Sequence, residues 1–551
     1  MRRTPAPQRG PAAPPRRRLR RCVLVLITAL SWALLFAVVG WHTFAPYRDV
    51  DILIVGGTVV DGTGGEPRVY DVAIRDGRVL GLSTWRFYFS RAKLRIEAAG
   101  KVVAPGFIDV HTHVEPNIPQ AAAFQPANFL RQGVTTIITG NCGRSRTDVA
   151  GLFKGLEKSK TYINVATLIG HNSVRQEVMG SDSRPPGPQE LARMKGVVER
   201  AMQSGALGLS TGLVYSPGRF ADTAELVELS QSSARAGGIY VSHIRDEGDR
   251  GLEAIREALE VGRLSQAPTH ISHFKCSGRA QWSTAPRRLE VLEAARAAGQ
   301  VVTLDAYPYD RSSTTTDVLL PDWALRDKRA GLREAARSPL VRRRLRDEIL
   351  ALMRRGGWED LAHVRLVAGQ ENWVGRTLVE VPVAAASDVN RQVENLIDIS
   401  LRGGTQAIYG DMSEEDVSRI IRDPFCVFGS DSAVRDPEYL YKPHPRGSGT
   451  FPRIFARYVR DEQLLNLAQA IRKATGQAAD IFRLDRRGYL RPNAWADVVI
   501  FDLEKIRDAA DYDQPFAAPA GIDYVVVNGV VAVDHGNLTS DAPAGRVVMR
   551  Q

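Results

Sequence analysis

The stretch GFIDVHTH, residues 106–113, places two histidines directly after an apolar run with the character of a buried strand. In a β-strand, side chains two residues apart point to the same side, so His111 and His113 would face the same space. A lone His-x-His pair also occurs on surfaces and in cores, and by itself it does not identify a metal site. Its interpretation depends on whether other metal-binding residues recur at equivalent places further along the chain.

The middle of the chain repeats this arrangement of an apolar, strand-like run followed by a helix-like stretch. The runs are residues 104–113, 135–143, 163–172, 206–213, 238–245, 269–276, 301–309 and 425–431. Continuous apolar strands that alternate with helices indicate a parallel sheet buried on both faces. Eight such units predict a closed (β/α)8, or TIM, barrel. The long interval before the last run predicts an inserted lobe around residues 310–400.

Short β-rich segments broken by glycine turns lie on both sides of this middle region. They occupy residues 51–103 and 490–551, and their turn residues are typical of a small antiparallel sheet. We therefore predict an α/β fold in which residues 104–489 form the barrel and both ends of the chain form one small β-sandwich.

The N-terminal region has a different composition. Residues 1–21 contain eight arginines and no acidic residue, which predicts a disordered basic tail. Residues 22–41 carry no charge, and at about 1.5 Å per residue they would reach roughly 30 Å, the thickness of a bilayer's hydrocarbon core. The sequence therefore predicts a single transmembrane helix with a cytoplasmic N-terminus and the body of the protein outside the cytoplasm. The alternative is a cleaved signal peptide.

The net charge of +11 resembles that of a nucleic-acid-binding protein, but its distribution does not. Without the eight arginines of the N-terminal tail the charge is 11 − 8 = +3 over the rest of the chain. A nearly neutral body lacks the basic surface that binds phosphates, so we expect no nucleic-acid partner.

Side chains that can bind metal ions, bind a substrate or transfer protons follow many of the strand-like runs. The C-terminal ends of barrel strands all face one mouth, so these residues would converge there. They are His111, His113, Cys142, His171, His243, Arg245, His273, Lys275, Tyr307 and Asp431. Catalytic zinc takes three protein ligands and a water, and Cys142, His243 and His273 could supply those three. Asp431, at the end of the eighth run, could serve as a general base.

Several motifs in order resemble those of the amidohydrolase superfamily, and more narrowly its N-acyl-D-amino-acid deacylase (D-aminoacylase) branch. The motifs are GFIDVHTH, GNCG, YVSHIRDE, ISHFK, GSD and HPRGSGTFPR. The resemblance runs from about residue 51 to the C-terminus. It implies a zinc-containing barrel with a small β-sandwich. It also implies hydrolysis of the linear amide bond of N-acyl D-amino acids to a free amino acid and a carboxylate.

The resemblance implies a role for each polar residue at the strand ends. A tight zinc ion would be held by Cys142, His243 and His273, and a second, weaker metal site would be formed by His111 and His113. The catalytic acid/base would be Asp431. The substrate carboxylate would be bound by Lys275, Tyr307 and Arg446.

Two features depart from the pattern of that branch. Val114 and Glu115 follow the His-x-His motif, where the branch often has aspartates, and the segment between Asp431 and Arg446 is longer. Two other functions stay open at this point. One is an amidohydrolase that acts on a cyclic amide or another N-acyl compound, and the other is a non-catalytic, membrane-tethered binding protein.

Overall fold

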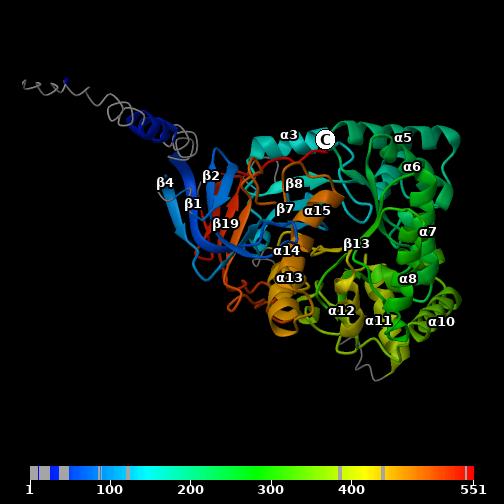
Figure 1. The fold of residues 1–551 in the computed structure, drawn as a ribbon. Coiled ribbons are helices and arrows are strands. Elements are labelled where there is room, and N and C mark those ends of the chain that lie inside the picture. Colours follow the sequence, from blue (N-terminus) through cyan, green and yellow to red (C-terminus); the bar gives the residue numbers. More distant parts are fainter. Residues whose placement is uncertain are drawn as a thin grey trace, which may run out of the picture.

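The structure is a computed structural model of the 551-residue chain. It describes residues 10, 25–35, 37, 49–84, 87, 90–118, 124–381, 388–435, 441–539 and 543–550. Figure 1 shows a barrel, a sheet built from both ends of the chain, and a lobe inserted into the barrel sequence.

The barrel consists of parallel strands that close into a ring. They are β6 (Phe107–Asp109), β7 (Val134–Thr139), β8 (Asn164–Thr167), β9 (Ile169–Gly170), β10 (Gly208–Gly212), β11 (Ile239–His243), β12 (Thr269–Ile271), β13 (Val302–Ala306) and β17 (Cys426–Phe428). Only Leu168 separates β8 from β9, so these two short strands count as one strand of the barrel. The described residues then contain eight barrel strands. The bridge between Thr112 and Ser432 joins β17 to β6 and closes the ring. The α/β barrel is thus present.

The helices of the barrel bury one face against the strands. In α7, buried Ala254, Ile255, Ala258 and Leu259 recur at spacings of three and four residues, which places them on one face of the helix. The helices of the barrel region are α2 (Ala127–Leu130), α3 (Val149–Ser159), α4 (His171–Met179), α5 (Pro188–Gln203), α6 (Thr223–Arg235), α7 (Gly251–Ser265), α8 (Ala285–Ala297), α12 (Glu414–Arg422), α13 (Arg446–Arg453), α14 (Leu467–Ala474) and α15 (Gly476–Ile481).

A nine-stranded sheet unites the two ends of the described chain. Its strands are β1 (Asp49–Val59), β2 (Arg68–Arg75), β3 (Arg78–Ser83), β4 (Arg91–Glu97), β5 (Val102–Pro105), β18 (Val498–Phe501), β19 (Ile522–Val527), β20 (Val530–Asp534) and β21 (Asn537–Leu538). β5 pairs with β18, which is why the blue and red strands lie side by side in Figure 1. Buried residues such as Ile54, Val72 and Ile500 give the sheet its own core.

An aromatic cluster fastens this sheet to the barrel. The ring of Phe107 on β6 stacks on Phe451 at 5.3 Å and on Phe455 at 4.9 Å, and Phe455 lies 5.1 Å from Phe501 on β18. All four rings are buried, so the first barrel strand is fixed next to the histidines that follow it.

The lobe lies between β13 and β17 and has a separate core. It contains β14 (Ser312–Thr315), α9 (Asp322–Ala335), α10 (Pro339–Arg355), β15 (Val364–Leu366), α11 (Val389–Leu401) and β16 (Gln406–Tyr409). Strand β16 pairs antiparallel with both β14 and β15, so these three strands form a small sheet that is distinct from the barrel. Buried Leu345, Ile349 and Leu396 pack the lobe helices against one another.

The structure corrects the prediction of a transmembrane helix over residues 22–41. Of this segment, residues 25–35 and 37 are described. No helix within the described ranges is long and apolar enough to cross a membrane. The predicted membrane anchor and the extracytoplasmic location inferred from it are therefore wrong. Apart from Gly10, the predicted disordered tail of residues 1–21 lies outside the described residues.

Candidate metal centre

Three of the predicted site residues lie in strained turns just beyond their strands. Cys142, His273 and Asp431 have φ angles of +51°, +33° and +49°, in the left-handed region that residues other than glycine rarely adopt. Such a conformation costs about 1–3 kcal/mol and persists where the surrounding structure fixes it. Here the amide N–H of Asp431 donates to the carbonyl of His111 at 2.8 Å, and that of His273 to Asp305 at 2.9 Å. All three side chains belong to the two groups of potential metal ligands described below.

The thiol of Cys142 lies at the centre of a cluster of imidazoles. Its Sγ atom is 3.4 Å from His243 Nδ1, 3.4 Å from His273 Nε2 and 3.3 Å from His111 Nε2. Zinc bonded at about 2.3 Å to sulfur and about 2.0–2.1 Å to nitrogen, in a tetrahedron, would separate sulfur from nitrogen by roughly 3.5 Å. The spacing of Cys142, His243 and His273 fits that geometry.

A second group of ligand atoms shares the same thiol. His111, His113, Cys142 and Asp431 each offer one ligand atom, and these atoms lie within 4.8 Å of one another. His113 Nε2 is 2.9 Å from Asp431 Oδ1, and His111 Nε2 is 3.7 Å from the same oxygen. Since Cys142 belongs to both groups, it could bridge two metal positions.

The charges of the cluster favour the ionised forms of its thiol and its carboxylate. Burial opposes ionisation of Cys142, but the charges of His111, His273 and His243 outweigh it and hold the pKa of the thiol well below its usual value. Burial likewise opposes ionisation of Asp431. The adjacent Arg446 and the hydrogen bond from His113 nevertheless hold the pKa of this carboxyl well below its usual range. Thiolate and carboxylate are the forms that bind metal and accept protons.

Asp305 on β13 contacts two histidines, His111 and His270, through one carboxylate oxygen. Its Oδ2 atom is 3.3 Å from His111 Nδ1 and 2.9 Å from His270 Nε2. His111 therefore turns its other ring nitrogen, Nε2, toward Cys142. His270 also contacts Thr303 at 2.8 Å, and it is in neither of the two groups of ligand atoms found among the described residues.

The three residues predicted to bind a substrate carboxylate lie close together. The guanidinium of Arg446 lies 4.6 Å from the ring centroid of Tyr307, and Lys275 Nζ lies 5.8 Å from the same centroid. Arg446 Nη1 is 2.9 Å from Asp431 Oδ2, whereas Lys275 Nζ is 2.6 Å from Glu247 Oε1. Within the described part of the chain, the buried hydroxyl of Tyr307 has no hydrogen-bond partner. Arg446 thus contacts both the carboxylate of Asp431 and the ring of Tyr307.

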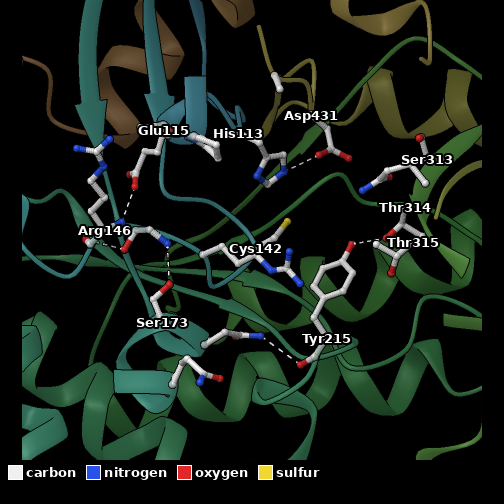
Figure 2. Close-up of a pocket in the computed structure, with 18 of the residues that line it drawn as sticks. His113, Glu115, Cys142, Arg146, Ser173, Tyr215, Ser313, Thr314, Thr315 and Asp431 are labelled. Carbon is white, nitrogen blue, oxygen red and sulfur yellow. Dashed lines mark hydrogen bonds and ion pairs between the residues drawn. The ribbon is translucent and has the colours of Figure 1, made fainter. Parts of the chain in front are cut away.

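Four of the predicted site residues, His113, Cys142, Asp431 and Arg446, line a cavity of about 1200 Å³. Figure 2 shows Cys142 between the His113–Asp431 pair and Tyr215. The hydroxyl of Tyr215 is 2.8 Å from Thr314 Oγ1, so the barrel and the inserted lobe meet in the cavity wall. The lobe therefore helps to determine the size of a molecule that reaches the thiol and the histidines.

Three residues of the site are absent from the sequence-based prediction. Asp305 precedes Tyr307 by two positions on the same strand-like run, so the alternation of side chains could have revealed it. Glu247 and Tyr215 follow their strands in irregular loops, and no periodicity indicates where such side chains point.

A barrel that gathers a thiol, imidazoles and a carboxylate at its mouth has the architecture of a metal-dependent hydrolase. Residues 95–533 match the model of the amidohydrolase family, and the chain belongs to that family.

Three relatives illustrate the similarity. The N-acyl-D-glutamate deacylase of Alcaligenes xylosoxydans xylosoxydans is 34% identical over 502 residues, which cover 87% of this chain and 93% of the relative. An N-acyl-D-glutamate deacylase from Bordetella bronchiseptica, solved with zinc and a phosphonate inhibitor, is 32% identical with a TM-score of 0.76, covering 91% of this chain and all of that one. A D-aminoacylase whose binuclear metal center shows one-metal activation and second-metal attenuation is 31% identical with a TM-score of 0.75 and the same coverage.

Proposed function

We propose that the protein is a zinc-dependent hydrolase that cleaves the amide bond of N-acyl D-amino acids, releasing a free amino acid and a carboxylate. The observation that carries this proposal is the convergence of Cys142, His243 and His273 beside the Asp431–Arg446 pair. The similarity to deacylases of N-acyl D-amino acids supports both the reaction and the D configuration.

The donor atoms of Cys142, His243 and His273 would hold the catalytic zinc. One sulfur and two imidazole nitrogens suit zinc, and three protein ligands leave the fourth position open. When bound there, zinc lowers the pKa of a water molecule and polarises the scissile carbonyl. His111 and His113, together with Asp431, would form the second and weaker position.

In this proposal Asp431 is the general acid and base. Its charge is retained by Arg446 at 2.9 Å, and its other oxygen faces His113 at 2.9 Å, so the carboxylate is fixed at the cavity wall. In our proposal it accepts a proton from the attacking water and returns that proton to the leaving nitrogen. The second transfer is necessary because an unprotonated amide nitrogen is a poor leaving group. In the overall reaction one water is consumed and the carbon–nitrogen bond is broken.

The carboxylate of the substrate would lie against Arg446 and Tyr307, with Lys275 behind them. Arg446 is a planar donor that can bind a carboxylate through two nitrogens. The hydroxyl of Tyr307, which has no partner among the described residues, can donate to the same group. A carboxylate bound there would place the amide bond next to Asp431, because Arg446 contacts both.

A panel of N-acyl D- and L-amino acids tests the proposal. Purified, zinc-loaded protein is expected to release amino acid from N-acyl D-amino acids and not from their L enantiomers. A matched cyclic amide such as a hydantoin should not be opened. Turnover of the cyclic amide without turnover of any linear N-acyl amino acid would refute the proposed reaction.

A further inference from the structure

Glu247 occupies a loop that is held in place by a buried arginine. Arg288 on α8, only 2% exposed, donates to the carbonyl of Glu247 at 2.7 Å and to that of Lys275 at 3.0 Å. It also donates to the carbonyl of Gly248 at 2.6 Å. One guanidinium thus binds the loop after β11 and the loop after β12. It holds the backbone of Glu247 in place relative to that of Lys275.

The carboxylate of Glu247 faces the outer nitrogens of two predicted zinc ligands. Its Oε1 atom is 3.0 Å from His273 Nδ1, and its Oε2 atom is 3.7 Å from His243 Nε2. The inner nitrogens of the same rings, His273 Nε2 and His243 Nδ1, both point at Cys142. A single carboxylate therefore stands behind both imidazoles.

Lys275 competes for one of these nitrogens. Its Nζ atom is 2.8 Å from His273 Nδ1 and 2.6 Å from Glu247 Oε1. An ammonium group can donate hydrogen bonds but cannot accept them. If it donated to Nδ1, the proton of the neutral ring would stay on Nε2, and that nitrogen could not bind a metal.

Glu247 resolves this competition because it accepts from both groups. With the ammonium and His273 Nδ1–H both donating to Oε1, the lone pair of His273 is left on Nε2, toward Cys142. The distances support this arrangement, since Oε1 lies 2.6 Å from Lys275 Nζ and 3.0 Å from His273 Nδ1.

We propose that Glu247 is a positioning residue that selects the metal-binding tautomer of His273 and prevents Lys275 from capturing its outer nitrogen. This inference rests on the proposed zinc-dependent function. Carboxylates that accept from metal-binding histidines orient the ring and fix its tautomer. A second consequence is that the ammonium of Lys275 is paired with the carboxylate of Glu247. Arg446 therefore supplies most of the electrostatic attraction for a substrate carboxylate.

Zinc affinity, measured without substrate by competition with a chromophoric chelator, tests the proposal. Glu247→Gln is expected to weaken zinc binding by about 10–100-fold, the usual effect of losing such a partner. Adding Lys275→Met to this variant should recover most of the affinity, because the competing donor is gone. A general structural role for Glu247 would not be rescued by removing a second side chain.

The matched control is Glu257→Gln, which alters a carboxylate that binds Arg245 at 2.8 Å, and it should leave zinc affinity within about twofold of the wild type. Wild-type affinity in Glu247→Gln, or no recovery in the double variant, would overturn the proposal. Wild-type protein that binds zinc but cleaves no N-acyl amino acid would refute the proposed function alone, and the affinity comparison would still decide the role of Glu247.

Discussion

Replacing Asp431 by asparagine separates proton transfer from metal binding. The amide oxygen of the new side chain can still accept from His113, but the negative charge that faces Arg446 at 2.9 Å is lost. Loss of a general base lowers the rate by about 10²–10⁴-fold. At 1.36 kcal/mol for each factor of ten, this is about 3–5 kcal/mol of activation free energy.

Asp431→Asn should still bind the tight zinc ion, since Cys142, His243 and His273 are unchanged. Kinetics and metal analysis are to be measured on the same preparation, by release of amino acid and by mass spectrometry of the metal. Leaving a buried arginine unpaired also destabilises a fold by about 3–5 kcal/mol, so thermal unfolding sets the assay temperature.

Asp508→Asn is the matched control for this substitution. It breaks a similar pair, with Arg453 at 3.1 Å, without removing a residue of the cavity wall. Its kcat should stay within about twofold of the wild type, as expected for a distant site. An Asp431→Asn variant that retains more than a tenth of wild-type kcat, or that loses the tight zinc ion, would refute the assigned role.

Four further outcomes are expected. Arg446→Met should weaken binding of carboxylate-bearing substrates by about 10–100-fold, equivalent to a charged hydrogen bond of about 1.5–3 kcal/mol, and should spare the corresponding methyl esters in KM measurements. Phe107→Ala should cost about 3–5 kcal/mol in urea unfolding, because it empties a buried aromatic cluster, whereas Val69→Ala at an exposed position should change stability by less than about 0.5 kcal/mol. Burial lowers the pKa of His363 to about 4, below its unfolded value of 6.5, so the unfolded state binds the proton more tightly. The contribution of His363 to stability should therefore be lost as the pH falls from 6.5 to 4, by up to about 3 kcal/mol. This loss should be visible in fluorescence of the stacked Trp358 and absent in His363→Gln. A strong zinc chelator should abolish turnover and added zinc should restore it, and activity that survives metal removal would exclude the proposed chemistry.

The barrel could be predicted because its strands are buried on both faces. The six residues of β7, Val134–Thr139, are all buried, and all are β-branched valine, threonine or isoleucine, a composition typical of a buried strand. The last residues of the strand-like runs then indicate the barrel mouth, which is how Cys142 and His273 could be found without coordinates. The single apolar segment at the N-terminus, residues 22–41, carries less information than the repeated strand-like runs. There, hydropathy alone predicted a membrane-spanning helix that the described residues do not support.

The loops of the site could not be predicted in the same way. Glu247 lies in an irregular segment whose direction is set by the guanidinium of Arg288, a residue on the later helix α8. The contact between Tyr215 and Thr314 depends on how the inserted lobe packs against the barrel, and neither residue belongs to a periodic pattern. Tertiary contacts between segments distant in sequence, rather than local propensity, determine these positions.

X-ray absorption spectroscopy of the zinc-loaded protein tests the central claim most directly, because it reports the atoms bound to the metal. The structure predicts one sulfur at about 2.3 Å with nitrogen ligands at about 2.0–2.1 Å, and loss of the sulfur in Cys142→Ser. A zinc ion surrounded by nitrogen and oxygen alone, or a sulfur ligand that persists in Cys142→Ser, would contradict the account.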